Sequence, residues 1–504
     1  MKLKEVLAGC SCEPRETMFL EKEISGISYD SRRVERGNVF IAIRGEHYDG
    51  HDFIPDAMKR GASAIIHEKE DTGNGLKKKE IPTFIRVKES RDALACIAGN
   101  FYRAPSQEVL VIGVTGTNGK TTTTYLIKSI LQSWGKESGL IGTVRYLIKD
   151  REYPAFHTTP EAPEFQGLLR EMVSSGCTHI VAEVSSHALS QKRVDYTRFS
   201  TAAFTNLTRD HLDFHGTMEN YFSAKKRLFT ELLTRGGTGV INVDDEWGGR
   251  LFYELQGTRH LVTYGLNSRA DINAVDIVNS FSGVSFLLKM RGKGVEEMHS
   301  SLVGIANVYN VLAAVAVSLS VGTPIEVAAE GVRSVMPVPG RLEKVEAGQN
   351  QNFLCLVDYA HTPDALERLI EMMRSISRDW GHNGKIITVF GCGGNRDRGK
   401  RPLMGEIATR ESDHVILTSD NPRMEDPSEI IKEIVLGVVS DNYITVPDRS
   451  EAIQKAVKMA NRGDVVIIAG KGHEDYQEVK GVRYPFSDRA LAREAIRDSA
   501  RADK

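Results

Sequence analysis

The chain has 504 residues, and at roughly 150 residues per domain this length suggests about three domains. Hydrophobic residues make up 41% and charged residues 26%, a composition typical of globular proteins, which excludes a disordered chain. The 65 Lys and Arg residues against 67 Asp and Glu residues leave a formal charge of -2, so no overall basic field indicates nucleic-acid binding. A local cluster of cations can still hold a small anionic ligand.

Six cysteines in a chain of this length do not indicate a disulfide framework, and Cys10 and Cys12 lie too close together for a zinc knuckle. The amino-terminal segment has two lysines and no long apolar run, which argues against a signal peptide. No stretch approaches the ~20 apolar residues of a membrane span. The sequence therefore predicts a reduced, soluble, cytoplasmic enzyme without a membrane or nucleic-acid partner.

The first block, residues 1–105, mixes short apolar runs with turn residues and ends at a proline, which disfavours helix in the residue before it. The middle block, 106–336, opens with the β-branched run 109–114, typical of a parallel strand buried on both faces. Similar runs recur, separated by helical stretches, at 179–184, 201–205 and 239–243. This alternation predicts a mainly parallel α/β sheet.

The third block, 337–504, starts in a proline-rich turn and repeats the pattern, with strands expected at 353–357, 385–390, 414–417 and 464–469. Each strand runs into Gly, His, Asn or Asp, as strand ends that face a ligand crevice often do. The fold class is therefore α/β with three domains, and two adjacent α/β blocks suggest a ligand bound between two domains.

The strongest local signal is the run Gly-Thr-Asn-Gly-Lys-Thr-Thr at 116–122, directly after the first buried strand. It can be led by Gly113 or by Gly116, and both alternatives place Lys120 at the start of a helix. The glycines let backbone N–H groups converge on phosphate oxygens, Lys120 adds a charge near the β- and γ-phosphates, and the Thr121 hydroxyl can ligate Mg²⁺. A plain glycine-rich turn is the alternative, and the order of strand, lysine, threonines and helix disfavours it.

Ionisable residues follow the next strands of the middle block. Glu183 ends one strand, where it could hold a Mg²⁺-bound water or simply act as a polar strand cap. The segment 204–216 is so dense in charge that burying it without a metal or an anion would be costly, although a solvated loop remains the alternative. The segment 221–229 predicts a basic amphipathic helix, whose simplest role is a solvated charged face.

With these motifs the chain resembles the Mur ligases, the ATP-dependent amide-forming enzymes of peptidoglycan synthesis. The resemblance covers nearly the whole chain, with matches in order at 115–122 (TGTNGKTT), 183–187 (EVSSH), 204–216 (FTNLTRDHLDFHG), 221–225 (YFSAK), 340–341 (GR), 357–364 (VDYAHTPD), 391–397 (GCGGNRD) and 470–474 (GKGHE). It implies an amino-terminal domain (1–105) that binds a UDP-sugar, a central P-loop ATPase (106–336) and a Rossmann-like carboxyl-terminal domain (337–504) that receives an amino acid.

The implied activity is ATP-dependent ligation of meso-2,6-diaminopimelate to UDP-N-acetylmuramoyl-L-alanyl-D-glutamate through an acyl phosphate, with release of ADP and phosphate. These small molecules are the expected partners, and we expect a monomer. Two other classes stay open. A folate-polyglutamate ligase would share the central ATPase, and a nucleotide-gated scaffold would bind ATP without turnover.

The resemblance implies that Lys225 is carbamylated and that the carbamate holds a second Mg²⁺ together with His211. A carbamate offers the oxygen ligands that Mg²⁺ prefers. Thr121 and Glu183 are implied to hold the first Mg²⁺, and Lys120 to neutralise charge on the transferring phosphate. The expected cofactors are thus two Mg²⁺ ions, with ATP as cosubstrate, and the expected catalytic residues are Lys120, Glu183, His211 and Lys225.

ATP contacts beyond the loop are implied at Asn307 for the base, Arg341 for phosphate and Asp358 for the ribose. Ala306 replaces a histidine that some relatives carry before the asparagine. The implied ATP-binding set is Gly116, Thr117, Asn118, Gly119, Lys120, Thr121, Thr122, Asn307, Arg341 and Asp358.

Binding of the UDP-sugar peptide is implied for an Asp-Ser-Arg motif at 30–32 and for a group in the middle block. The set is Ser31, Thr158, Thr159, Ser185, Gln191 and Arg193. The segment 46–48 (Glu-His-Tyr) departs from the family pattern, so the resemblance implies no definite contact there.

The amino-acid selector is implied to be Asp420-Asn421-Pro422-Arg423, because lysine-adding relatives replace the arginine. A guanidinium can grip the second carboxylate of meso-diaminopimelate with two hydrogen bonds, and an unpaired Arg423 penalises lysine. Three further residues complete the implied pocket, with Glu474 pairing the distal ammonium: Arg396, Gly470 and Glu474.

Overall fold

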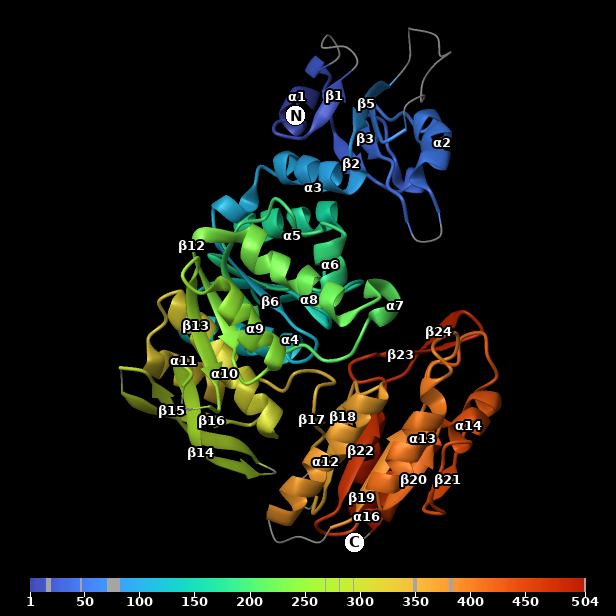
Figure 1. Ribbon diagram of the computed structural model, residues 1–504. Coiled ribbons are helices and arrows are strands. Elements are labelled where there is room, and N and C mark those ends of the chain that lie inside the picture. Colours follow the sequence, from blue (N-terminus) through green and yellow to red (C-terminus); the bar gives the residue numbers. More distant parts are fainter. Residues whose placement is uncertain are drawn as a thin grey trace. The chain divides into compact units, whose positions relative to one another are not determined.

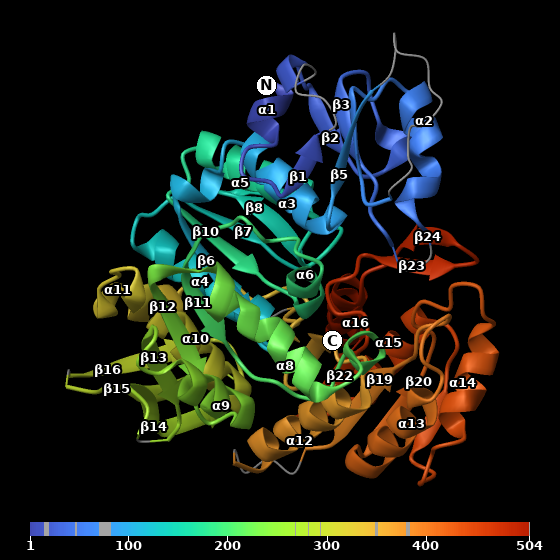
Figure 2. The ribbon, with the colours of Figure 1, turned by 45° about the horizontal axis from the view of Figure 1, so that its top comes forward.

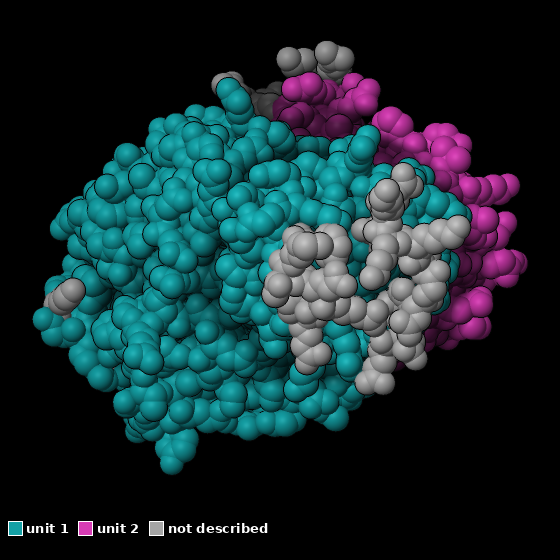
Figure 3. All heavy atoms as spheres, turned by 90° about the horizontal axis from the view of Figure 1, so that it is seen from above, with its two compact units in different colours: residues 1–273, 288–296, 309–331 teal, residues 274–287, 297–308, 332–504 magenta. Residues whose placement is uncertain are grey.

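The computed structural model describes residues 1–14, 20–45, 48–69, 82–267, 269–280, 282–292, 294–347, 351–379 and 384–502, so Glu46 and His47 lie outside the described residues. The chain forms two compact units, coloured separately in Figure 3. The first comprises Met1–Asn273, Leu288–Glu296 and Tyr309–Gly331, and the second comprises Ala274–Leu287, Glu297–Val308 and Val332–Lys504. In the described ranges, no helix combines the length and the apolar character needed to cross a membrane.

The first unit begins with a five-stranded sheet of order β1-β5-β4-β3-β2, of which β1, β2, β3 and β5 are labelled in Figure 1. Its strands are β1 (Cys12–Pro14), β2 (Gly26–Ser28), β3 (Asn38–Ile41), β4 (Ala64–His67) and β5 (Thr83–Val87). Strands β2 to β5 are parallel, and β1 pairs antiparallel with β5. Apolar side chains of α1 (Leu3–Val6) and α3 (Ser90–Phe101) pack on one face, and those of α2 (Ile54–Lys59) pack on the other.

One disulfide joins Cys10, which follows α1, to Cys96 in α3. The sequence predicted reduced cysteines, and this pair departs from that expectation, although the other four cysteines, all in described parts of the chain, are free and there is no disulfide framework among the six. The two cysteines are 86 residues apart in the chain, so no local spacing reveals their pairing. The packing of α1 against α3 brings their Cα atoms to 5.8 Å, within bonding reach.

The middle of the chain forms an 11-stranded sheet of order β16-β15-β14-β13-β12-β11-β6-β10-β7-β8-β9. Its strands are β6 (Leu110–Thr115), β7 (Ser138–Ile141), β8 (Arg145–Ile148), β9 (Arg151–Pro154), β10 (His179–Glu183), β11 (Phe199–Phe204), β12 (Leu233–Asn242), β13 (His260–Gly265), β14 (Ile272–Ser280), β15 (Gly283–Met290) and β16 (Val295–Ser300). In sheet order, the adjacent strands β13, β12, β11, β6, β10 and β7 run parallel to one another. Strand β8 pairs antiparallel with β7, and β9 pairs antiparallel with β8. The prediction of a mainly parallel sheet is confirmed.

The helices of this part are α4 (Lys120–Ser133), α5 (Ala162–Ser174), α6 (Ser186–Ser190), α7 (Leu212–His215), α8 (Met218–Arg227), α9 (Glu246–Leu255), α10 (Ile305–Ser320) and α11 (Ile325–Arg333). Side chains of α5, α6, α8 and α9 share one core with the sheet, and α4 packs on β6, β7 and β10. The register sets Glu183 opposite Val114, and Phe204 opposite Thr115. Because β6, β10 and β11 end level with one another, the three loops that follow them leave the same edge of the sheet.

The second unit holds a six-stranded sheet of order β17-β18-β22-β19-β20-β21. Its strands are β17 (Glu343–Lys344), β18 (Leu354–Asp358), β19 (Ile386–Phe390), β20 (His414–Leu417), β21 (Tyr443–Thr445) and β22 (Val465–Ala469). Helices α12 (Pro363–Asp379), α13 (Lys400–Glu411) and α14 (Pro427–Val435) cover one face, and α15 (Arg449–Met459) and α16 (Asp488–Ala502) cover the other (Figure 2). A hairpin, β23 (Tyr476–Val479) and β24 (Val482–Pro485), follows β22. This doubly wound sheet confirms the Rossmann-like prediction.

Candidate active site

The glycine-rich loop joins β6 to α4 and leaves no room for side chains at two positions. Gly116 has a φ of 147°, and an added Cβ would lie 1.9 Å from Thr205 Oγ1. Gly119 has a φ of 85°, and an added Cβ would lie 2.4 Å from Asn310 Oδ1. Both positions therefore require glycine. The close approach leaves the loop backbone at the amino terminus of α4, a location suited to an anion.

The segment after β11 supports this loop through hydrogen bonds that sequence reasoning missed. Thr205 Oγ1 donates to the Asn118 carbonyl at 2.6 Å. Asn206 accepts from both loop amides, with Oδ1 2.9 Å from Asn118 N and its carbonyl 2.9 Å from Thr117 N. Thr208 N donates to Thr117 Oγ1 at 3.0 Å. The polar residues that follow β11 were a signal for these contacts, but the sequence analysis gave functional roles only to the ionisable residues among them.

Two lysine side chains donate hydrogen bonds to the same carbonyl of the loop. Lys120 Nζ donates to the carbonyls of Gly116 and Thr117 at 2.9 and 2.8 Å, and Lys225 Nζ donates to the Gly116 carbonyl at 2.7 Å. Lys225 is 1% exposed, and its Nζ lies 4.7 Å from the centre of the Tyr221 ring. Burial, and next to it the charge of Lys120, holds the pKa of the Lys225 amine well below its usual range.

Glu183 is fully buried at the end of β10, and three donors surround its carboxylate. Thr121 Oγ1 donates to Oε2 at 3.0 Å, Thr143 Oγ1 donates to Oε2 at 2.9 Å, and Thr143 N donates to Oε1 at 2.9 Å. The structure thus joins Thr121 and Glu183, the two residues implied for the first metal.

The donor set around Glu183 fits Mg²⁺, which takes hydroxyl, carboxylate, phosphate and water oxygens. Within the described ranges, no group of three or more His, Cys, Asp or Glu side chains is arranged to hold a metal ion by itself. A Mg²⁺ ion held by Thr121 and Glu183 would therefore take its remaining ligands from a bound phosphate and from water, as is usual at nucleotide sites.

His211 lies in an aromatic group after β11. Its ring centre is 4.8 Å from that of His187 and 6.1 Å from that of Tyr221. Tyr221 OH lies 3.1 Å from Thr117 Oγ1 in the loop. Tyr221 therefore connects three predicted site residues, because its ring contacts His211 and Lys225 while its hydroxyl contacts the loop. Nothing in the sequence assigned it a role.

Five of the six residues implied for the UDP-sugar peptide converge near Glu183. Thr158 Oγ1 lies 3.0 Å from Thr143 Oγ1. Thr159 Oγ1 donates to the Glu183 carbonyl at 2.8 Å, and Ser185 N donates to Thr159 Oγ1 at 3.1 Å. These contacts place a row of hydroxyls beside Glu183.

Arg193 and Gln191 continue this row. Arg193 Nη1 donates to the Thr159 carbonyl at 3.0 Å, Nη2 donates to Gln191 Oε1 at 2.6 Å, and Nε lies 3.0 Å from a Glu161 oxygen. Ser31 lies apart from the row, in the 3₁₀ turn Ser31–Arg33, which Asp30 caps by accepting from Arg32 N at 3.0 Å. The described contacts do not join Ser31 to the other five residues.

In the second unit, two residues implied for ATP lie together. Asp358 ends β18, and its carboxylate accepts from Leu342 N at 2.7 Å and Ala360 N at 2.8 Å. The Arg341 guanidinium lies 4.8 Å from the centre of the Tyr359 ring, and its Nε is buried without a hydrogen-bond partner among the described residues. An unsatisfied buried guanidinium nitrogen suits an anionic ligand. Asn307, also implied for ATP, is buried and donates to the Val303 carbonyl at 2.7 Å.

Glycines join this cluster to the implied amino-acid pocket. A Cβ at Gly340 would lie 2.0 Å from His473 N, and a Cβ at Gly470 would lie 2.6 Å from Asp420 Oδ2. Asn421 is 2% exposed, and its Nδ2 donates to Glu474 Oε2 at 2.7 Å. The structure therefore brings Asp420, Asn421, Gly470 and Glu474 together.

Arg423 approaches this cluster from a strained position with a φ of 52°. Its Nη1 donates to the Gly394 carbonyl at 2.8 Å, and its Nε lies 3.9 Å from a Glu478 oxygen. An added Cβ at Gly393 would lie 2.9 Å from Arg423 Nη1 and 3.7 Å from Arg396 Cγ, so the two arginines flank one glycine. Pro422 is buried, and a Cβ added at Gly394 would lie 1.9 Å from its carbonyl oxygen.

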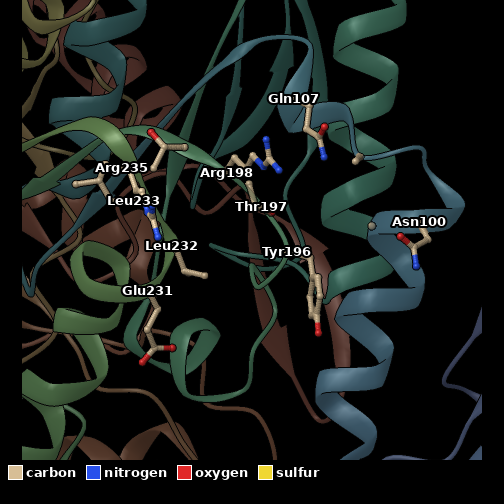
Figure 4. Close-up of a pocket in the computed structure, with 12 residues that line it drawn as sticks. Asn100, Gln107, Tyr196, Thr197, Arg198, Glu231, Leu232, Leu233 and Arg235 are labelled. Atoms are coloured by element: carbon tan, nitrogen blue, oxygen red, sulfur yellow. The ribbon is translucent and has the colours of Figure 1, made fainter. Parts of the chain in front are cut away.

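A pocket of about 640 Å³ in the first unit contains none of these residues (Figure 4). Its walls include Gln107, Tyr196, Arg198 and Arg235. These residues precede or begin β6, β11 and β12, so the pocket lies at the amino ends of the strands, and the glycine-rich loop lies at their carboxyl ends.

Three family models match the chain. The Mur ligase family catalytic domain matches residues 23–102, the Mur ligase middle domain matches 114–318, and the Mur ligase glutamate ligase domain matches 340–472. Together they span most of the sequence.

Relatives match over nearly the full length. A UDP-N-acetylmuramoyl-L-alanyl-D-glutamate–2,6-diaminopimelate ligase from Solibacter usitatus (strain Ellin6076) is 44% identical over 99% of this chain and 98% of its own. One from Clostridium tetani (strain Massachusetts / E88) is 43% identical over 99% and 100%. A solved structure of a ligase with this activity is 34% identical, with a TM-score of 0.71 over 99% of each chain.

Proposed function

The chain belongs to the Mur ligase family, and we propose that it joins meso-2,6-diaminopimelate to UDP-N-acetylmuramoyl-L-alanyl-D-glutamate with conversion of ATP to ADP and phosphate. The observation that carries this proposal is the 44% identity to a ligase of that name over 99% of this chain, which has an arginine at position 423, the selector that the resemblance implies. The product would be the UDP-sugar tripeptide used in peptidoglycan synthesis.

The ATP site would be the loop 116–122 together with Asn307, Arg341 and Asp358. Lys120 would move from the loop carbonyls to the β- and γ-phosphates, because a phosphate oxygen is a stronger acceptor for an ammonium than a carbonyl is. Two Mg²⁺ ions would neutralise charge on the triphosphate when bound, one at Thr121 and Glu183, the other at His211 and the modified Lys225.

Lys225 would be carbamylated. Its neutral amine attacks the carbon of CO₂, an N–C bond forms and the proton leaves to water, giving an anionic carbamate. Burial favours the neutral amine by lowering its pKa, and the nearby Lys120 cation would then stabilise the anion instead of repelling an ammonium. The carbamate would supply the oxygen ligands that the ammonium lacks.

The row formed by Thr158, Thr159, Ser185, Gln191 and Arg193 would hold the dipeptide end of the UDP-sugar substrate, with Ser31 contacting its sugar-nucleotide part. The terminal carboxylate of the dipeptide would attack the γ-phosphorus of ATP, and ADP would leave. The amino group of the diamino acid would then attack the acyl phosphate and release phosphate. Exclusion of water from the site would protect that intermediate.

The amino acid would bind in the second unit. Arg423, flanked by Arg396, would hold the distal carboxylate, and Glu474 would pair with the distal ammonium. Asp420, Asn421, Pro422 and Gly470 would shape the pocket. We further propose that the domains divide at residues 105 and 336, and that the protein acts as a cytoplasmic monomer.

The test is an assay of purified protein with ATP, Mg²⁺ and the UDP-sugar dipeptide, given meso-diaminopimelate or lysine. We expect equimolar ADP and a new amide with meso-diaminopimelate, and little of either with lysine. ADP release without an amide would contradict ligation. Phosphate release with a dihydropteroate substrate would favour a folate-type ligase, and ATP binding without any turnover would favour a scaffold.

A further inference from the structure

The second unit contains a buried lysine with no assigned role. Lys471 follows β22 and Gly470, and its side chain is 0% exposed. Its Nζ donates to Asn421 Oδ1 at 3.0 Å and to Glu474 Oε2 at 3.2 Å. An ammonium is seldom buried without such compensation, so these two contacts account for its presence there.

These contacts determine the orientation of the Asn421 amide. Lys471 Nζ and Glu478 N both donate to Asn421 Oδ1, at 3.0 and 2.9 Å. A lysine ammonium and a backbone amide can only donate, so they require the oxygen of the side-chain amide on their side. The Asn421 Nδ2 group must then face Glu474, where it donates to Oε2 at 2.7 Å.

The same contacts orient Glu474. The described hydrogen bonds to its carboxylate, from Lys471 and Asn421, both fall on Oε2. The other oxygen, Oε1, is therefore the one directed away from this network. Glu474 is 18% exposed, so its carboxylate is held on one side and reachable on the other.

We infer that Lys471 is a positioning residue for recognition of the diamino acid. It locks Asn421 and Glu474 in one arrangement, so that Glu474 Oε1 is ready for the distal ammonium of the substrate. Lys471 acts through these two side chains and does not touch the reacting atoms. The inference rests on the proposed function, because it concerns the amino-acid site of that reaction.

The test is steady-state kinetics of Lys471→Met in the full-length protein. Met keeps most of the aliphatic stem of the side chain but has no donor, so the KM for meso-diaminopimelate should rise about 10- to 100-fold. The KM for ATP and the kcat at saturating amino acid should change less than about threefold. Preference for meso-diaminopimelate over 2-aminopimelate, which lacks the distal ammonium, should fall, and a merely structural role would not change that preference.

Three further variants keep the test decisive. Lys480→Met, at an exposed position between β23 and β24, should leave all constants unchanged. Lys471→Arg retains a donor and should recover part of the lost affinity. Asn421→Asp keeps the side-chain shape but places a carboxylate against Glu474, and should raise the same KM even if Lys471→Met does not fold.

An unchanged KM for meso-diaminopimelate in folded Lys471→Met, or equal losses for every substrate, would overturn the inference. If Lys471→Met does not fold, an unchanged KM in Asn421→Asp would overturn it. Failure of the unmodified protein to form the amide would instead overturn the proposed function, so the two failures are distinguishable.

Discussion

Lys120 and Lys225 donate hydrogen bonds to the same oxygen, the Gly116 carbonyl, at 2.9 and 2.7 Å. Two ammonium groups on one carbonyl would repel each other, and Lys225 is the buried member, whose pKa is well below its usual range. Lys225 therefore reaches the neutral state at a lower pH than an ordinary lysine. The neutral amine is the form that reacts with CO₂.

We predict that Lys225→Met abolishes ligation, with a fall in kcat of about 100-fold or more because the oxygen ligands of the carbamate are lost. Amide formation and ADP release measure the effect, and added bicarbonate should not rescue it. Lys226→Met is the control, because Lys226 pairs with Glu254 at the surface at 2.9 Å. Full activity in Lys225→Met would exclude the carbamate.

Removing the charge of Glu183 should raise the Mg²⁺ requirement. Glu183→Gln keeps the size of the side chain, but its amide is a poorer metal ligand, so kcat should fall about 100-fold at moderate Mg²⁺. A Mg²⁺ titration of phosphate release checks this. Glu171→Gln, on the exposed side of α5, is the matched control. Unchanged Mg²⁺ dependence in Glu183→Gln would mean that the metal binds elsewhere.

Replacing Arg423 by lysine should lower kcat/KM for meso-diaminopimelate about 10- to 100-fold, because lysine cannot grip a carboxylate with two parallel hydrogen bonds. The KM for ATP should stay the same. Arg483→Lys is the matched control. Both arginines lie near the Glu478 carboxylate, with Nε at 3.9 Å for Arg423 and at 4.0 Å for Arg483, but Arg483 is 66% exposed. An unchanged preference over lysine would remove Arg423 as the selector.

Stability should depend on pH through His215. Burial, and then the neighbouring His187, lower the pKa of His215 to about 4, below its ordinary 6.5. Between these values the unfolded chain binds the proton and the folded chain does not, so this residue makes stability fall as pH drops from 6.5 to 4. Urea unfolding across that range should show a smaller pH slope for His215→Phe than for the unmodified protein. An identical slope would contradict the assignment.

The buried ion pair Arg449–Asp488 should make removal of one partner alone more destabilising than removal of both. Both side chains are 0% exposed, and their closest atoms are 2.7 Å apart. Arg449 Nη2 also donates to the Ala469 carbonyl at 2.9 Å, at the end of β22. Arg449→Met leaves Asp488 buried and unpaired, and should lower the free energy of unfolding by about 3–5 kcal/mol.

Urea denaturation of Arg449→Met and of the double variant Arg449→Met/Asp488→Leu separates the two contributions. Because the double variant buries no unpaired charge, it should recover most of the loss. A loss in the double variant as large as the loss in Arg449→Met would show that the unpaired charge is not the cause.

Several elements could be predicted because their signals are local. The buried strands appear in the sequence as β-branched runs. The glycine-rich loop places Lys120 and Thr121 next to each other in the chain. The supporting contacts could not be predicted in this way. Asn206 reaches Asn118, 88 residues earlier in the chain, because β11 lies beside β6. Tyr221, in α8, reaches Thr117, which lies 104 residues earlier.

The disulfide and the role of Lys471 illustrate the same limit. Cys10 and Cys96 are paired by the packing of α1 on α3, and the composition pointed the other way. In the sequence, Lys471 is one residue of the motif GKGHE and has no role of its own. In the structure it is buried against Asn421, 50 residues earlier, and orients that amide.

The sequence by itself determined the α/β class, the position of the glycine-rich loop and the family, because each depends on the order of residues along a short stretch or on a series of such stretches. Only the tertiary structure decided which polar groups face one another. Examples are the Gly116 carbonyl, which accepts from both lysines, and the Asn421 amide, which is held between Lys471 and Glu474. Those pairings depend on which strands adjoin and on how deeply a side chain is buried, since burial makes an unpaired polar group costly and so selects its partners.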